Sequence, residues 1–438
     1  MSRSLLLREL PRLTVTVLGL QLVFLALLVL GAAFPDRPVV EQLSSDVAAG
    51  AYGPSGASDG QGGRATGFTD CVAAGTGLGA PALSAFERAI RMPRLDSCSV
   101  GARQIARLQR GERVERLEYF RYWAGYTTLT RPVLAAGGMD AMRLVAGGLF
   151  GLALLAMVLA VSRVTSLGYA LALTAPLLLS SNVLSVPATA FSHALSLAVA
   201  FGGIALAARA TRHLERSVLY AVAAGACLFN FVDLLTTPAL PWALTSAVVA
   251  AAAFTSTRSL RATLRSGVVS AGVWAVAYVV TWMSRWVIAA VILGPGHVGD
   301  NVRDTARFRI DGDFRDVSHA FGAAVVRNAR TWLDVPLMPW VVLVGCVGTA
   351  VAALVVAVRA YGAARLEVAA VMGAPALIAP AWMLVLSNHS QVHTFFVYRT
   401  VPVSLGIVVG ACLLAARGAR TASDQEPPNR WRGPSASG

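Results

Sequence analysis

The sequence predicts an all-α membrane protein, a polytopic bundle of about ten transmembrane helices with a long extracytoplasmic loop after the first helix. Three observations predict this class. The chain of 438 residues is 56% hydrophobic and only 14% charged, whereas soluble domains are nearer about 25% charged. Ten apolar runs have the character of membrane spans. One polar segment, residues 35–140, separates the first run from the second.

All of the basic charge comes from arginine. The 37 basic residues include no lysine, and the formal net charge is +14. A strong positive charge is common in nucleic-acid-binding proteins, but most of these arginines flank apolar runs, where they orient helices in the membrane. We therefore expect no nucleic-acid partner, and we expect the lipid bilayer to surround the chain.

The first apolar run, Leu13 to Phe34, follows Arg3, Arg8 and Arg12. Positive charge before a first span predicts a cytoplasmic amino terminus. A cleaved signal peptide has a shorter apolar core of about 7 to 15 residues, so we interpret the run as an uncleaved anchor. The polar segment then begins outside the cell at Pro35.

Nine further apolar runs follow the polar segment. They are Met142 to Val161, Leu167 to Leu184, Ala188 to Ala208, Val218 to Leu235, Leu240 to Phe254, Val268 to Leu293, Leu337 to Val358, Leu366 to Leu386 and Val401 to Ala416. If the chain crosses the membrane at each run, every inner loop carries arginine, and the short outer turns around Asn182 and Thr236 carry none. The positive-inside rule thus supports the alternation independently of hydropathy and predicts that both termini are cytoplasmic.

These runs divide the chain into four regions. Residues 1–34 form the cytoplasmic amino terminus and first helix, residues 35–140 the extracytoplasmic loop with juxtamembrane helices, and residues 141–416 the transmembrane bundle. Residues 417–438 are rich in Arg, Pro, Ser and Gly, which is typical of a disordered tail. No internal repeat is visible, which weakens the case for an inverted-repeat transporter.

Two of the five cysteines, Cys71 and Cys98, lie in the polar segment, and the other three fall inside apolar runs. Outside the cell such a pair is a candidate disulfide. Two unbonded thiols fit the sequence equally well, because sequence spacing gives no distance between the sulfur atoms.

Within the polar segment, Gly50 to Gly67 is rich in Gly, Ser and Ala and predicts a mobile loop, whereas Pro81 to Arg91 predicts a helix. From Val100 to Trp123 apolar and arginine side chains separate onto two sides of a predicted helix. Such a helix lies in the membrane interface, with anionic lipid head groups as partners. A solvated face with an ion pair between Glu112 and Arg116 fits the same pattern.

Aromatic residues gather just before the second span. One interpretation is a belt that anchors the protein at the bilayer boundary. The other is a binding platform for a sugar or prenyl group, formed by Tyr119, Tyr122 and Trp123, since these rings combine an apolar face with a polar edge. Arg121 and Arg131 would then bind phosphate.

The last outer loop holds His389 and His393, which are four residues apart and would share a face of a helix. A metal pair is conceivable, but no carboxylate or cysteine accompanies them locally, so the sequence requires no metal. Hydrogen bonding to a polar ligand and a purely interfacial role are the other interpretations. The sequence therefore leaves cofactors unassigned, a divalent metal included.

Three charged residues lie in or beside apolar runs. Arg285 is well inside its run, where an ionisable residue is a functional candidate by default. Arg399 precedes the last run, where it fits either binding of a lipid phosphate or extension to the interface. Asp233 is the only acid near the outer end of its hairpin; a ligand contact and the cap of a broken helix fit it equally.

This layout resembles the GT-C class of membrane glycosyltransferases, which take sugars from polyprenyl-phosphate donors on the outer side of the membrane. The resemblance covers most of the chain: one span, a long outer loop with acidic residues and juxtamembrane helices, and then a multi-span bundle. The stretches Tyr119 to Arg131 and Asn388 to Arg399 also look like those of uncharacterised bacterial polytopic proteins. The resemblance implies sugar transfer from a polyprenyl-phosphate donor to a glycan or lipid acceptor of the cell envelope.

In the GT-C class an acid of the first outer loop takes the proton from the acceptor hydroxyl, and a basic residue of a late span or loop holds the donor phosphate. The resemblance therefore implies Asp70 as the base, with Asp46 and Asp36 behind it. Arg399 and Arg285 are the implied phosphate ligands. Many members carry a paired acidic motif close after the first span, and this chain has none there.

Two other functions fit the sequence. A transporter or lipid flippase predicts polar or charged residues near the midplane of several spans, but apart from Arg285 the spans offer mostly Ser, Thr, Asn and Pro. A non-enzymatic membrane scaffold would use the long outer loop to bind a partner. We keep the transferase as the first hypothesis.

Overall fold

The computed structural model describes residues 3–53, 68–96, 98–213, 215–314 and 316–417. In this part of the chain nearly all regular structure is helical, and the exception is a two-stranded antiparallel sheet of β1 (Pro93–Arg94) and β2 (Leu117–Glu118). The predicted tail falls almost entirely outside the described residues, as does most of the predicted mobile loop. The all-α class is confirmed.

Eight helical segments of the described part are long and apolar enough to cross a membrane. They are α1 (Arg3–Ala33), α6 (Thr127–Val164), α9 (Phe191–Ala210), α11 (Ala239–Thr257), α12 (Leu260–Leu293), α15 (Met338–Tyr361), the segment Ala364–Val385 and the segment Thr394–Ala416. The two other predicted spans correspond to α7 (Leu167–Ser180), which has only 14 residues, and to the more polar α10 (Glu215–Val232). The polytopic bundle is therefore confirmed at eight candidate spans.

Two of the candidate spans are built from several helices. Segment Ala364–Val385 contains α16 (Ala364–Gly373), the 3-10 turn η2 (Ala374–Leu377) and α17 (Ile378–Val385). Segment Thr394–Ala416 contains the short α19 (Thr394–Val397) and the long α20 (Thr400–Ala416). Proline at 375 removes a backbone donor, which explains the change of helix type after α16.

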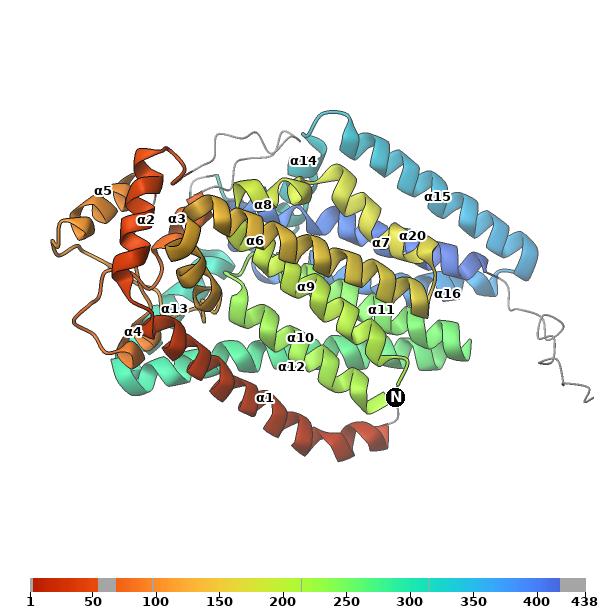
Figure 1. Cartoon of the computed structure of the whole chain (residues 1–438). Helices are drawn as coiled ribbons and strands as arrows, with labels where there is room; N and C mark the ends of the chain where they lie inside the picture. The colour runs from red at the N-terminus through yellow and green to blue at the C-terminus, as the bar shows by residue number, and fades with distance from the viewer. Residues whose placement is uncertain (1–2, 54–67, 97, 214, 315, 418–438) are drawn as a thin grey trace, which may run out of the picture.

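The long helices lie side by side, and short helices gather at one end of the bundle (Figure 1). These short helices include α2 (Asp36–Ala48), α3 (Phe68–Gly75), α4 (Ala85–Arg91), α5 (Cys98–Gln109) and α13 (Pro295–Asp311). We name this end the capped end. The start of α1 lies at the opposite end, together with the carboxyl ends of α6, α9, α11 and α15. These four helix ends carry Arg163, Arg209, Arg258 and Arg359.

Four further short elements connect the longer helices. They are η1 (Asn182–Leu184), α8 (Val186–Thr189), α14 (Ala323–Leu333) and α18 (Ser387–Val392).

The predicted helix in residues 81–91 is present in shortened form as α4. Ser84 caps it, since its hydroxyl accepts from the Glu87 backbone N–H while the Glu87 carboxylate accepts from the Ser84 N–H. The predicted helix from Val100 to Trp123 is wrong beyond Gln109. Gly111 has φ +79°, a left-handed conformation that ends the helix, and the chain then pairs with β1.

Helix α6 begins at Thr127, well before the predicted span, and it kinks at Gly137 and Gly138. Gly138 has φ +68°, and a Cβ atom there would lie 2.5 Å from the carboxylate oxygens of Asp46. This close approach lets the Asp46 carboxylate accept from the Met139 backbone N–H at 2.9 Å. The kink therefore joins α2 to the start of the transmembrane part of α6.

The bundle core is close-packed, and its outer helices expose apolar side chains. Gly203 and Gly225 let α9 and α10 approach until a Cβ at Gly203 would lie 3.3 Å from the Gly225 Cα, as small residues do between membrane helices. Leu22 of α1, Val291 of α12 and Val344 of α15 are largely exposed. Exposed apolar faces of this kind suit contact with lipid.

Candidate functional site

A cavity of about 450 Å³ lies at the capped end. Its wall comes from α3, the segment after β2, the first turn of α9, the turn between α10 and α11, α13, and the region of α18 and α19. Five residues predicted from the sequence line it: Tyr119, Arg121, Tyr122, His389 and His393. The fold thus joins two segments that are far apart in the chain and that the sequence singled out separately.

One side of the cavity is cationic and aromatic. The Arg121 guanidinium carbon lies 5.1 Å from the Tyr119 ring centre and 5.5 Å from that of Tyr122. Arg309 of α13 lies 5.5 Å from the Tyr122 ring centre and donates to its hydroxyl. Within the described ranges neither arginine forms an ion pair with a carboxylate. Their positive charge is available to an anionic ligand.

The two predicted histidines contribute no charge near pH 7. Their ring centres are 4.6 Å apart, and His389 Nε2 is 3.1 Å from the Leu235 carbonyl oxygen. Burial and then the nearby His393 and Arg309 lower the pKa of His389 well below 6.5. Burial and the Arg309 charge lower the pKa of His393 to about 4. The positive potential of the cavity therefore comes from arginine.

Neither histidine belongs to a larger cluster of metal-ligand side chains. Among the residues that the structure describes, no three His, Cys, Asp or Glu side chains come close enough to hold a metal ion together.

Three ionisable residues of the cavity lining were not predicted from the sequence: His193, Asp304 and Arg309. Asp304 supplies a carboxylate and is exposed. Asp304 and Arg309 lie on α13. Asp304 and Phe308 are four residues apart and therefore share a face of this helix, and Arg309 follows Phe308. This spacing was the sequence signal that could have identified them. His193 falls inside an apolar run, where a lone histidine is not distinctive.

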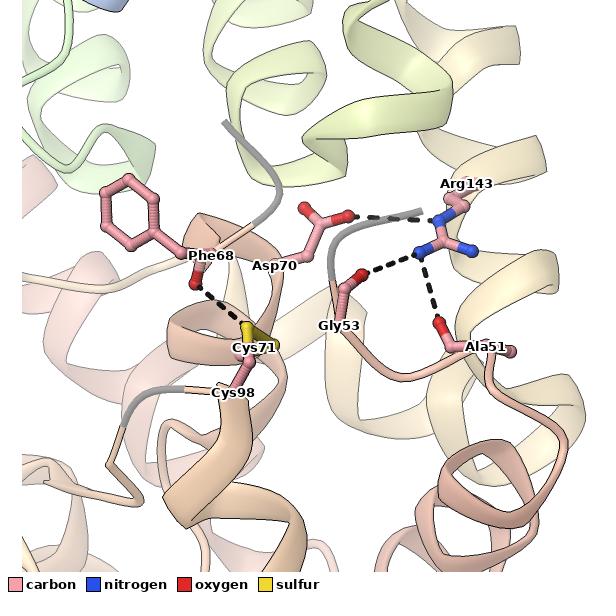
Figure 2. The surroundings of a disulfide bond; sticks show 7 residues. All are labelled: Ala51, Gly53, Phe68, Asp70, Cys71, Cys98 and Arg143. Atoms are coloured by element: carbon pink, nitrogen blue, oxygen red, sulfur yellow. Dashed lines mark hydrogen bonds and ion pairs between the residues drawn. A yellow bond between two sulfur atoms is a disulfide. The ribbon is translucent and has the colours of Figure 1, made fainter. Parts of the chain in front are cut away.

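Asp70 lies beside the cavity but does not line it, although the preceding residue Thr69 does. Its side chain is fully buried, and a carboxylate oxygen lies 3.8 Å from Arg143 Nε (Figure 2). Burial raises the pKa of Asp70 to about 7, against the opposing effects of Arg143 and of backbone N–H groups at Phe191 and Ser192. The carboxyl group is therefore partly protonated at neutral pH, which is unusual for aspartate.

A disulfide holds this corner together. Cys71 and Cys98 are bonded, with a Cα–Cα distance of 5.1 Å, so α3 is tied to α5 (Figure 2). Of the two interpretations that the sequence left open, the structure contains the bonded form. Arg143 also donates to the carbonyl oxygens of Ala51 and Gly53, at 3.2 and 3.5 Å. The disulfide and the Arg143 hydrogen bonds thus hold together the backbone segments around Asp70.

The other predicted acids lie away from the cavity. Asp36 accepts from Arg131 Nη2 at 2.6 Å, from Arg88 at 3.2 Å and from the Gly79 backbone N–H at 3.0 Å. Arg131 also donates to the Gly77 carbonyl oxygen. Together with Asp46 at the α6 kink, these residues hold the polar segment on the bundle, and none of Asp36, Asp46 and Arg131 lines the cavity.

Arg285 is fully buried on α12 and bonds to backbone rather than to the cavity. Its Nε donates to the carbonyl oxygens of Phe120 and Tyr122, both at 2.9 Å. Its Nη2 donates to those of Ala89 and Ile90, at 3.1 and 2.7 Å. Arg285 therefore fixes the segment that carries Arg121 and Tyr122 and acts on the cavity only through them.

Trp123 and Asp233 also have internal partners. Trp123 is fully buried, and its Nε1 donates to the Thr281 carbonyl oxygen at 2.6 Å. Asp233 accepts from the Thr236 backbone N–H at 2.8 Å and from the Thr236 hydroxyl. These two bonds hold the turn between α10 and α11, so the Asp233 carboxylate is engaged within the chain.

Arg399 lies one side chain behind the cavity wall. It is 1% exposed. Its Nε donates to Asn182 Oδ1 at 2.7 Å, and its Nη1 lies 3.3 Å from Nδ1 of His193, which lines the cavity. Asp70, Arg285 and Arg399 are therefore all close to the capped end, but none of the three is part of the cavity surface.

Fold and site together define a polytopic helical membrane protein with a cationic cavity at one end of its bundle. No protein family, curated protein or solved structure is found to match the chain.

Proposed function

We propose that the chain is a membrane glycosyltransferase that binds a polyprenyl-phosphate sugar in the cavity of the capped end. The supporting observation is the pair Arg121 and Arg309, which line the cavity without a carboxylate partner in the described residues. Guanidinium groups are well suited to phosphate, since they stay charged in partly apolar surroundings and offer paired N–H donors.

The apolar part of the lining favours a phosphate that is attached to a lipid. Phe308 lies next to Arg309 on α13, lines the cavity and is 39% exposed. Phe68 and Phe396 add further apolar surface. A ligand with an anionic head and a hydrocarbon chain would match both parts of this lining.

In the proposed orientation the capped end faces the extracytoplasmic side of the cell membrane, and both termini are cytoplasmic. Two observations support it. The arginine-bearing helix ends of α6, α9, α11 and α15 lie at the opposite end of the bundle, as the positive-inside rule favours. The disulfide between Cys71 and Cys98 lies at the capped end, and disulfides persist in oxidising compartments.

The proposed reaction is a direct displacement at the sugar. The acceptor hydroxyl oxygen bonds to the anomeric carbon while the bond from that carbon to the phosphate oxygen breaks. The leaving polyprenyl phosphate keeps the electron pair, and its charge is stabilised by Arg121 and Arg309. The hydroxyl proton passes to a carboxylate. Asp304 is the first candidate because it lines the cavity, and the buried Asp70 is the second.

The test is sugar transfer by purified protein in lipid vesicles that contain a polyprenyl-phosphate sugar, with cell-envelope glycans as acceptors. Arg309→Gln and Asp304→Asn are compared with Arg307→Gln and Asp300→Asn, which lie on the same helix outside the cavity lining. We expect losses of about 100-fold or more for the cavity variants and less than about twofold for the controls. Unchanged transfer in both cavity variants would contradict the proposal.

A transporter or lipid flippase is the second candidate, because three buried polar side chains, His193, Arg399 and Asn182, are hydrogen-bonded in a row behind the cavity wall. The transferase stays the first candidate, because these residues lie at helix ends near the capped end rather than at mid-helix, where a transporter would carry its polar residues. Movement of labelled lipid or solute across the vesicle membrane without sugar transfer would favour the carrier.

A further inference from the structure

His193 is a cavity residue with one unused nitrogen. It lies in the first turn of α9, lines the cavity and is only 1% exposed. Its Nδ1 is 3.3 Å from Arg399 Nη1, and its Nε2 is buried without a hydrogen-bond partner in the described structure. Buried polar atoms normally have partners, so an unpartnered nitrogen on a residue that lines the cavity points to a ligand.

The neighbours of His193 determine its protonation form. A guanidinium group can only donate hydrogen bonds. Nδ1 therefore accepts from Arg399, and the proton of the neutral ring is on Nε2. A doubly protonated ring would have no acceptor for Arg399 and would place two cations in contact. The imidazole is thus a neutral ring with its single N–H on the unpartnered side.

The ring is held in place from two directions. Arg399 is anchored by the Asn182 side-chain oxygen at 2.7 Å. The Phe396 ring contacts His193 edge to face, with ring centres 5.3 Å apart and an angle of 88° between the planes. Phe396 also lines the cavity. The direction of the Nε2–H bond is therefore set before a ligand arrives, which favours binding.

We propose that His193 is a ligand-binding residue whose Nε2–H donates to a phosphate oxygen of the prenyl-phosphate ligand, and that Arg399 is a positioning residue that holds the required tautomer. This inference rests on the proposed function and deepens it. It also gives Arg399 a role in phosphate binding through His193 rather than by direct contact.

Two substitutions separate the two nitrogens of the ring. In His193→Gln the side-chain amide N–H reaches the region of Nε2, whereas in His193→Asn the shorter amide reaches only the region of Nδ1. The ligand probe is farnesyl phosphate, with farnesol and inorganic phosphate as comparison probes, and binding is measured by calorimetry in detergent. Thermal unfolding midpoints of both variants check that they fold.

We expect wild type to bind farnesyl phosphate more tightly than either comparison probe. The Gln variant should stay within about threefold of wild type, and the Asn variant should bind about 10- to 100-fold more weakly, the range for a hydrogen bond to a charged group. Equal binding by wild type and both variants would overturn the role of His193 while leaving the proposed function intact. If wild type binds farnesol as tightly as farnesyl phosphate, both the role of His193 and the proposed function are overturned. If wild type binds inorganic phosphate as tightly as farnesyl phosphate, the site is one for free anions and not for a lipid phosphate.

The tautomer has its own test. Nitrogen-15 NMR of the histidine side chains, with His193 assigned from its absence in the Gln variant, should show a protonated Nε2 and an unprotonated Nδ1 at pH 7. In Arg399→Met this preference should be lost. A protonated Nδ1 in the wild-type protein would contradict the inference, whatever the binding result.

Discussion

Replacing Asp70 by asparagine should change how the stability of the protein depends on pH. Asp70 is fully buried, and burial raises its pKa to about 7 in the folded protein, whereas an unfolded aspartate has a pKa near 3.9. Between about pH 4 and pH 7 the folded state therefore holds a proton that the unfolded state has released. When the unfolded state binds fewer protons, the free energy of unfolding falls as pH rises.

The magnitude follows from the width of this window. One proton of difference corresponds to about 1.4 kcal/mol per pH unit. Between pH 5 and pH 7 the wild type should lose about 2 kcal/mol that Asp70→Asn does not lose, because the folded carboxyl group is already about half ionised at pH 7. Above about pH 8 both proteins should show the same dependence on pH, because the folded aspartate is then ionised as well.

The assay is unfolding in detergent micelles between pH 5 and pH 8.5, followed by tryptophan fluorescence. The quantity of interest is the stability difference between Asp70→Asn and wild type at each pH. Asp300→Asn, whose side chain is largely exposed, serves as the control and should give a flat difference. A flat difference for Asp70→Asn too, or one that falls with rising pH, would refute the view that Asp70 is buried with a raised pKa.

Three further predictions follow from the contacts. Cys98→Ser should lower the free energy of unfolding by about 3 to 4 kcal/mol, the loop-closure value for a sequence separation of 27. The reduced wild-type protein should unfold like this variant. A wild-type stability that does not change on reduction would contradict the disulfide. Gly138→Ala should lower the free energy of unfolding by about 1 to 3 kcal/mol, because the new Cβ would lie 2.5 Å from the Asp46 carboxylate. Gly148→Ala is the control, since a Cβ there would meet open space on the same helix, and it should not lower the free energy of unfolding. Equal unfolding midpoints for the two variants would contradict this prediction. Arg309→Gln should raise the pKa of His393 from about 4 toward 6.5, since it removes a nearby positive charge; an unchanged proton NMR titration would exclude that influence.

The bundle could be predicted from the sequence because its signals are local. Each predicted span corresponds to one helix or, at Leu366 to Leu386, to a run of consecutive short helices, and the arginine pattern alternates as the spans do. The errors lie where tertiary contact decides. The chain after Gln109 carries a helical pattern of apolar residues, yet it forms β2 because Pro93–Arg94 lies beside it. The kink of α6 at Gly137 and Gly138 likewise accompanies a contact between distant residues, the hydrogen bond from the Met139 N–H to Asp46.

The site was predicted only in part for a related reason. Arg285 was a functional candidate because it is a charge inside an apolar run, but its partners are four backbone carbonyl groups, which no sequence pattern reveals. Arg309 was missed because its role depends on α13 folding back over Tyr122. Residue type identified the candidates, and packing selected among them.

Photo-crosslinking can show whether the cavity of the capped end binds a lipid phosphate. A prenyl phosphate with a benzophenone group near its head is irradiated with the protein in lipid vesicles, and the modified peptides are identified by mass spectrometry. We expect labelling in residues 119–122, 304–309 or 389–396, suppressed by excess farnesyl phosphate and by Arg309→Gln. Labelling confined to the lipid-facing sides of α1 or α15, and unaffected by competitor, would contradict it.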